Sequence, residues 1–241
     1  MAPSVDLAIY VAILGIAVSL GLYAHQLMVS RRARRLLEHF TSGEKWIAAL
    51  EQLHRENSHL RIVSRTPGLL LPTEQSESQS HREYFAMMWG RLEGPGSYQL
   101  DYLVDLDGLR STLANYRATA HEDLIAESRK LVTRAERAVQ TGRLRIRTRK
   151  FESHVVSRVI GSTKEFGMGY RPETGQHTSE WVIVRNAQMT MIVANEFDQL
   201  FRLGERDEVG SAARVEPFTL ATFDAIVGTL PPVPSTAEGA G

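Results

Sequence analysis

The sequence predicts a mixed α/β fold, in which one sheet is flanked by helices, preceded by a single transmembrane helix. Residues 7–30 contain no formally charged side chain and are dominated by Leu, Ile, Val, Ala and Gly. Beyond residue 40, short apolar segments typical of strands alternate with longer segments of helical period. Such alternation favours a mixed α/β sheet over a helical bundle or a β-sandwich.

The apolar stretch at residues 7–30 is long enough to cross a bilayer, because a hydrocarbon core of roughly 30 Å needs about 20 helical residues. Only Asp6 precedes this stretch, and four arginines follow it: Arg31, Arg32, Arg34 and Arg35. A cleaved signal peptide carries its positive charge before the apolar stretch, so this order favours a retained anchor. By the positive-inside rule, we expect a single-pass inner-membrane protein with its N-terminus outside and its C-terminal domain in the cytoplasm.

The chain divides into four expected parts: a transmembrane anchor at 1–30, a juxtamembrane helical segment at 31–58, a cytoplasmic α/β domain at 59–204 and an acidic tail at 205–241. Leu36, Leu37 and Phe40 are expected to extend the first helix along the headgroup layer. A second helix is expected to begin after Thr41, whose capping-box partner is Glu44. The tail has two basic and six acidic residues, and we expect it to be largely disordered apart from one short helix.

Within the cytoplasmic domain, apolar runs bounded by turn residues predict strands, and helical spacing of apolar residues predicts helices. Expected strands cover residues 60–63, 98–104, 144–148, 181–184 and 189–193. Expected helices cover residues 81–92, 124–139 and 196–203. Gly142 provides the C-terminal stop of the longest helix. The last two strands are expected to form a hairpin, because Asn186 suits the turn between them.

The composition excludes several kinds of site. The chain has no cysteine, so it has no disulfide, no thiolate nucleophile and no cysteine-ligated metal. Its 28 basic and 28 acidic residues balance, so binding to a polyanion requires a local basic patch. The histidines show no metal-ligand spacing, and we expect neither a metal ion nor a cofactor in the preferred interpretation.

One local basic patch is present. We call it the arginine stripe: Arg143, Arg145, Arg147 and Arg149, with Lys150 directly after it. On a strand these four arginines leave the same face at intervals of roughly 6.5 to 7 Å. Arginine suits bidentate contact with phosphate, so the stripe predicts binding of a phosphate-bearing ligand, an anionic lipid or nucleic acid. The alternative is the solvated face of an edge strand, where charge discourages strand pairing.

A second motif lies where the strand at residues 98–104 ends. The order Asp105, Leu106, Asp107, Gly108 after apolar residues resembles the first motif of the haloacid dehalogenase superfamily, Asp-x-Asp-Gly-Thr. This resemblance implies Asp105 as nucleophile and Asp107 as acid/base, with magnesium balancing the charge. Leu109 replaces the family's threonine, and no later acidic pair follows an apolar strand. An ordinary strand end at a turn is the alternative.

A longer part of the chain resembles half of a phospholipase D superfamily protein. The resemblance rests on the order of strands and helices from residue 61 to residue 148 and on an apolar segment from Glu180 to Phe197. The family signature there is His-x-Lys-x-x-x-x-Asp-Gly. Its three catalytic positions fall on Thr178, Glu180 and Arg185, and His177 is one residue out of register. The resemblance therefore implies a catalytically degenerate domain, and paired family halves imply a homodimer.

These features favour a membrane-anchored, non-enzymatic sensor or adaptor. It would bind a phosphate-bearing ligand, an anionic lipid or a protein partner through the arginine stripe. The alternative is a membrane-tethered phosphodiesterase, nuclease or magnesium-dependent phosphatase, with His177 or the pair Asp105 and Asp107 as catalytic residues. Expected partners are the lipid bilayer, an anionic lipid or the phosphate of a nucleotide or nucleic acid, and a second copy or another component of a membrane-protein complex.

Overall fold

The computed structural model describes residues 37–40, 42–65, 67–72, 79–149, 156–162, 164–170, 180–202 and 216–232. The expected anchor at residues 7–30, the arginines at 31–35, Lys150 and His177 lie outside the described residues. Across the described ranges, no helix combines the length and the apolar character needed to cross a membrane.

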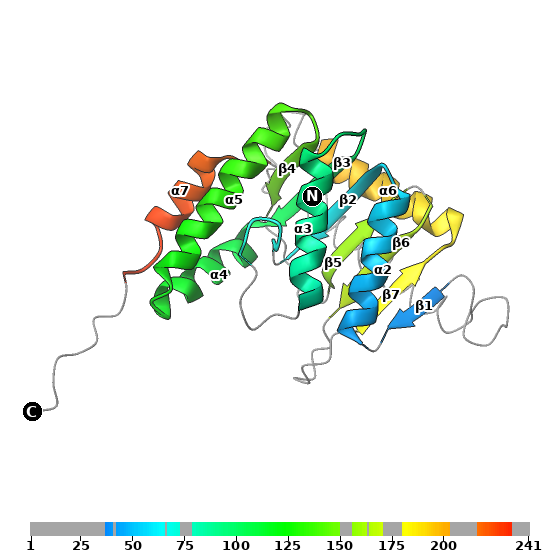
Figure 1. Ribbon diagram of the computed structural model, residues 1–241, viewed down its shortest axis with the longest axis horizontal. Helices are drawn as coiled ribbons and strands as arrows, with labels where there is room; N and C mark the ends of the chain where they lie inside the picture. Colours follow the sequence, from blue (N-terminus) through cyan, green and yellow to red (C-terminus); the bar gives the residue numbers. More distant parts are fainter. Residues whose placement is uncertain are drawn as a thin grey trace, which may run out of the picture.

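One eight-stranded mixed sheet organises the molecule (Figure 1). Its order is β1-β7-β6-β5-β2-β3-β4-β8. The strands are β1 (Leu37–Phe40), β2 (His59–Ser64), β3 (Gln99–Asp105), β4 (Leu144–Arg149), β5 (Val156–Gly161), β6 (Phe166–Tyr170), β7 (Glu180–Val184) and β8 (Glu216–Pro217). The neighbours β2, β3 and β4 are parallel, and every other pairing is antiparallel. The mixed α/β class predicted from the sequence is confirmed.

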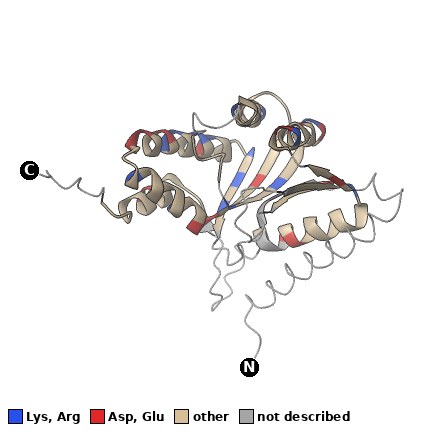
Figure 2. Cartoon of the chain, turned by 90° about the horizontal axis from the view of Figure 1, so that it is seen from below, with Lys and Arg blue, Asp and Glu red and all other residues tan. Residues whose placement is uncertain are grey.

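The described helices cover both faces of this sheet. They are α2 (Gly43–Glu56), α3 (Gln79–Glu93), α4 (Leu106–Ala118), α5 (Glu122–Gln140), α6 (Ala187–Arg202) and α7 (Leu220–Gly228). Helices α2, α3 and α5 lie on one face of the sheet, and α6 lies on the other (Figure 2). We call these the α5 face and the α6 face.

The two faces differ in how they are packed. The strands alternate, so Leu60, Ile62 and Tyr102 point to the α5 face, where they join one large apolar core. On the α6 face the apolar contacts fall into two small clusters, centred on Leu103 and on Phe166. Most of the buried apolar area therefore lies on the α5 face. Most of the hydrophobic stabilisation lies there too, because it scales with the apolar surface removed from water.

The expected strand at residues 189–193 is wrong, and with it the expected hairpin. These residues form the start of α6. Asn186 accepts a hydrogen bond from the Met189 amide through its side-chain oxygen at 3.0 Å, which satisfies a free N–H group of the first turn. Thr190, Phe197 and Phe201 are buried at helical spacing, so the segment packs one face of a helix against the sheet.

The expected helix over Leu37 and Phe40 is also wrong. These residues form β1, which pairs antiparallel with β7, and Leu37 lies opposite Val184. Helix α2 then packs into the large core through Trp46 and its neighbours. Residues 37–58 thus belong to the α/β domain instead of forming a separate juxtamembrane segment, because β1 completes the edge of the same sheet.

Other expected elements are present. Helix α5 ends before Gly142, whose φ of 70° gives the left-handed conformation that glycine adopts at little cost. The short helix expected in the tail is α7, and it packs Phe223 and Ile226 into the core beside α5 and α4. The rest of the tail, residues 205–215 and 233–241, lies outside the described residues.

Candidate functional site

The parallel register of β3 and β4 places Arg145 opposite Asp101, both on the α6 face. The Arg145 guanidinium donates to the two carboxylate oxygens of Asp101 from Nε at 2.6 Å and from Nη2 at 2.5 Å. Two parallel N–H to oxygen bonds of this kind fix the guanidinium in one plane. The Arg145 side chain nevertheless remains 55% exposed, so it is held in place and open to solvent at once.

A second basic side chain contacts the same carboxylate. His59, at the start of β2, lies 2.8 Å from Asp101 through its Nε2 atom. The Asp101 residue is only 2% exposed. Burial acts to raise the pKa of this carboxyl, but hydrogen bonds from His59 and Arg145 outweigh it and hold the pKa of Asp101 below its usual value. Asp101 is therefore a buried anion that positions two basic side chains around itself.

The same face carries contacts that join the strands to α6. Arg61 on β2 donates to both carboxylate oxygens of Asp198 at 2.9 and 3.1 Å. Arg147 on β4 donates to the Phe201 carbonyl at 2.5 Å. The guanidinium carbons of Arg145 and Arg147 lie 5.7 and 5.9 Å from the centre of the Phe201 ring. Charged contacts thus add to the apolar packing of α6 on the sheet.

A cavity of about 320 Å³ opens beside this network. Its lining consists of Gln99, Leu100, Asp101, Gly142, Arg143 and Arg145. Arg143 is itself fixed, since it donates from Nη1 to the Gly94 carbonyl at 2.9 Å. The cavity is therefore lined by two arginines, each held by a protein contact, and by one buried carboxylate.

The arginine stripe expected from the sequence is partly brought together. Arg145 and Arg147 lie on the α6 face with the contacts given above, and Arg143 directly precedes β4. The backbone of Arg149 ends β4, whereas its side chain and Lys150 lie outside the described part of the chain. The stripe does not lie on an edge strand, because β4 pairs with β3 on one side and, at Arg147 and Thr148, with β8 on the other.

Asp105 and Asp107 have local partners. Asp105 is 2% exposed, and its carboxylate accepts a hydrogen bond from the Asp107 amide as the N-cap of α4. Asp107 lies 3.8 Å from Arg110 in the first turn of the same helix. A Cβ atom on Gly108 would lie 2.0 Å from the Arg65 carbonyl oxygen, so this position requires glycine. Helix capping and close packing account for this motif.

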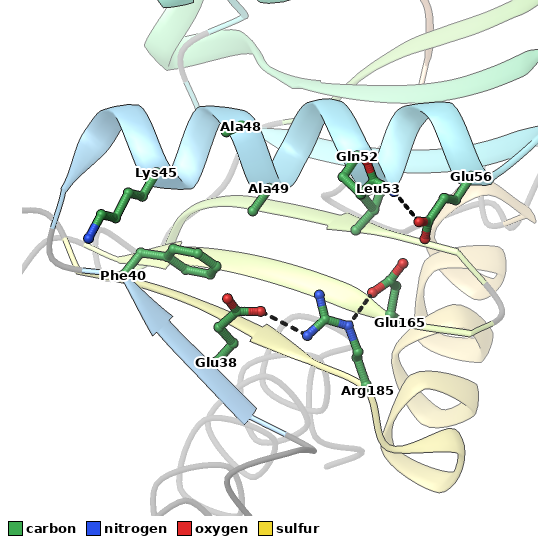
Figure 3. A pocket seen from close by; sticks show the side chains of 10 residues that line it. All are labelled: Glu38, Phe40, Lys45, Ala48, Ala49, Gln52, Leu53, Glu56, Glu165 and Arg185. Atoms are coloured by element: carbon green, nitrogen blue, oxygen red, sulfur yellow. Dashed lines mark hydrogen bonds and ion pairs between the residues drawn. The ribbon is translucent and has the colours of Figure 1, made fainter.

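A second cavity, of about 510 Å³, lies between α2 and the strands β1, β6 and β7 (Figure 3). Arg185 projects into it and donates to Glu38 at 2.8 Å and to Glu165 at 2.9 Å. The hydrogen bond to Glu38 raises the pKa of the Arg185 guanidinium above its ordinary value. Arg185 occupies the aspartate position of the phospholipase D signature, and here it forms an ion-pair cluster that links β7 to β1 and β6.

The other positions of that signature are not described. Thr178 and His177 lie outside the described residues, as does the side chain of Glu180. The ranges that the structure covers contain no group of three or more histidine, aspartate or glutamate side chains placed to hold a metal ion.

Sequence reasoning missed His59, Asp101 and Asp198. One signal was available for Asp101, which stands in the middle of the apolar strand that ends at Asp105. A buried charge in a central strand needs a partner of opposite sign, because burying it alone is costly. The identity of that partner depends on the register between β3 and β4, which no local pattern gives.

No protein-family model matches the chain, and no curated protein matches its sequence. The solved structures that are similar to it include the following two proteins. The archaeal chromatin protein TrmBL2 has 8% sequence identity and a TM-score of 0.43, covering 82% of this chain and 63% of its own. The phosphatidylserine synthase of Haemophilus influenzae Rd KW20 has 10% identity and a TM-score of 0.45, covering 80% of this chain and 43% of its own. The chain spans less than two thirds of the length of each of these proteins.

Proposed function

We propose that this protein is a membrane-anchored, non-enzymatic binding domain that takes a small phosphate-bearing ligand in the cavity lined by Arg143 and Arg145. One observation carries the proposal: two arginines, each fixed by a protein contact, flank a cavity of about 320 Å³. This volume falls at the lower end of the range for small-molecule sites, which favours a small ligand over a macromolecule.

The charge of the cavity supports an anionic ligand. Arg143 and Arg145 contribute two positive charges and Asp101 one negative charge, which leaves a surplus of one positive charge in the lining. His59 adds a further basic group on the same carboxylate. Arginine matches phosphate oxygens with two parallel N–H donors, and its fixed geometry lowers the cost of ordering the side chain on binding.

The membrane anchor is part of the proposal. It is supported by the uncharged stretch at residues 7–30 and by the arginines that follow it. This order places the α/β domain on the cytoplasmic side of the inner membrane, with the short N-terminus outside. The sheet begins at Leu37, so the domain follows the anchor with a short connection.

The family part of the proposal is a catalytically degenerate phospholipase D-like domain. It is supported by the chain order β2, α3, β3, α5 and β4, which is the order of elements expected from the resemblance, with α4 as an additional helix between β3 and α5. In that frame the catalytic positions carry Thr178, Glu180 and Arg185 in place of histidine, lysine and aspartate. The family reaction needs a histidine nucleophile, so this frame favours binding without catalysis.

Calorimetric titration of the full chain in phosphatidylcholine nanodiscs tests the proposal, with inorganic phosphate and a nucleoside triphosphate as ligands. We expect Arg143→Gln to weaken binding by about tenfold or more, because a hydrogen bond to a charged group contributes about 1.5–3 kcal/mol. Arg55→Gln is the matched control, since Arg55 is a 62% exposed arginine on α2. We expect that variant to bind as the parent does.

Three results would overturn the proposed function. The first is equal affinity in the parent, Arg143→Gln and Arg55→Gln. The second is no binding of inorganic phosphate or nucleoside triphosphate, together with binding of phosphatidic acid included in the disc. That result would assign the arginines to a lipid headgroup. The third is hydrolysis of a phosphodiester or phosphomonoester that Asp105→Asn or His177→Ala abolishes, which would make the protein an enzyme.

A further inference from the structure

The outer face of α6 has an unusual composition. Among the residues of α6 whose side chains the structure describes, five are exposed: Ala187, Gln188, Met191, Ile192 and Asn195. None of them carries a charge. They recur at helical spacing, so they form one stripe, which we call the outer stripe, over residues 187–195 of the helix. Asp198, seven residues after Met191, lies beyond its end and pairs with Arg61.

Two large apolar side chains lie in the middle of this stripe. Met191 is 58% exposed and Ile192 is 45% exposed. Exposed apolar residues scattered singly are common, but two neighbours within an uncharged helix face form a surface that gains free energy when it leaves water. The opposite side of α6 is already packed against the sheet through Phe197 and Phe201.

The chain connectivity places this stripe near the expected membrane surface. Leu37 pairs with Val184 at the end of β7, and α6 begins at Ala187, only three residues later. Leu37 lies seven positions after the end of the expected anchor at residue 30, with six residues between them. A fully extended chain of that length spans at most about 25 Å. Leu37 is thus tethered within that distance of the point where the chain leaves the bilayer, and α6 begins three residues after the strand partner of Leu37.

We propose that the outer stripe of α6 lies on the bilayer surface, with Met191 and Ile192 inserted at the boundary between headgroups and acyl chains. The proposal rests on the anchor in the proposed function. Helices of this kind bury their apolar side about 5–10 Å into that boundary. With the tether at Leu37, α6 provides a second point of attachment, and two attachments restrict the orientation of the domain.

A bilayer suits this stripe better than a second copy of the chain. Specific protein interfaces bury about 1,200–2,000 Å² in total, and a stripe with two large apolar side chains offers far less. A lipid surface needs no shape complementarity, and the tether keeps the stripe close to it whatever the protein concentration. The uncharged side chains also avoid the cost of bringing a charge into the boundary region.

The chain has no cysteine, so single labels can be placed without further changes. We would introduce Met191→Cys, attach an environment-sensitive fluorophore and reconstitute the full chain in phosphatidylcholine vesicles with and without brominated acyl chains. Val139→Cys is the matched control, because Val139 is an exposed apolar residue, 40% exposed, on α5. We expect bromolipid to quench the label at 191 several-fold more strongly than the label at 139.

Extraction of each labelled protein with alkaline carbonate separates the α6 proposal from the proposed membrane anchor, because a protein with a transmembrane anchor stays in the membrane. If the protein stays in the membrane and both labels are equally inaccessible to bromolipid, the α6 proposal is wrong and the anchor stands. If carbonate extracts the protein, the anchor fails and the α6 proposal fails with it. Cross-linking of Met191→Cys between copies without bromolipid quenching would assign the stripe to a protein interface and overturn the proposal.

Discussion

Helices α5 and α6 cover opposite faces of one sheet, yet their outer surfaces differ in kind. Six of the nine exposed residues of α5 are charged, as on an ordinary solvated helix, whereas none of the five described exposed residues of α6 is charged. Their inner surfaces differ as well. Val132 and Ala135 of α5 enter a large apolar core, while α6 attaches through two small apolar clusters and contacts to Arg61 and Arg147. The same sheet therefore supports one helix in water and one suited to a less polar surface.

The largest expected effect concerns the inner side of α6. Phe201 stacks on Phe197 with ring centres 5.1 Å apart and lies beneath two guanidinium groups. We expect Phe201→Ala to lower the free energy of unfolding by about 3–5 kcal/mol, because it leaves a cavity and removes those contacts. Thermal unfolding of the full chain in detergent measures this change. Val139→Ala on the outside of α5 is the control, with an expected change within about 0.5 kcal/mol. Equal losses in the two variants would contradict the account.

The second prediction concerns acid. The pKa of Asp101 is lower in the folded protein than its ordinary value of 3.8, so Asp101 stabilises the fold above about pH 4. That contribution is lost as the pH falls through the lower, folded-state pKa. We expect the unfolding free energy of the parent to fall more steeply over this range than that of Asp101→Asn. Unfolding curves measured at a series of pH values test this, and identical slopes would exclude the assigned role.

A smaller effect is expected for the ion pair between α6 and β2. Arg61 is 12% exposed and contacts both oxygens of Asp198, so Asp198→Asn should cost about 1 kcal/mol. Asp224, on α7, pairs with Arg129 of α5, and both are about half exposed. Asp224→Asn should cost less than about 0.5 kcal/mol, since exposed pairs contribute little. A larger loss for Asp224→Asn than for Asp198→Asn would show that burial does not decide the strength of these pairs.

The smallest effect on stability is expected for the outer stripe itself. Met191→Ser should change the unfolding free energy in detergent by no more than about 0.5 kcal/mol, because Met191 is 58% exposed and makes few packing contacts. A loss of 2 kcal/mol or more would indicate that Met191 packs within the protein, and the stripe would then not be an outer surface.

Local patterns in the sequence predicted the parts of the fold that depend on local physics. The alternation in β2, the apolar run of β3 and the glycine after α5 each follow from period or conformation. The start of α6 was misjudged because Met189 to Val193 is rich in apolar and β-branched residues, which favour a strand. The side chain of Asn186 and the packing of Phe197 against the sheet outweigh that preference.

The candidate site could be predicted only in part. The arginines of β4 were visible as a pattern, but their contacts depend on residues far away in the chain: Arg145 on Asp101, Arg147 on Phe201 and Arg143 on Gly94. Those contacts follow from strand register and from the placement of α6, which the sequence does not encode locally. Likewise, the uncharged face of α6 could not be identified while that segment was expected to be a strand.

Spin labels placed singly along α6 and α5 of the full chain in proteoliposomes test the contrast between the two helices most directly. Collision rates with lipid-soluble oxygen and with a water-soluble nickel complex would be compared at each site. We expect the ratio of the oxygen collision rate to the nickel collision rate to oscillate along α6 with a helical period and to peak at Met191 and Ile192. At every exposed site on α5, we expect the nickel collision rate to be the higher of the two. If labels at Met191 and Ile192 collide with nickel as much more often than with oxygen as labels at Arg129 and Lys130 do, the proposed contact of α6 with the bilayer is contradicted.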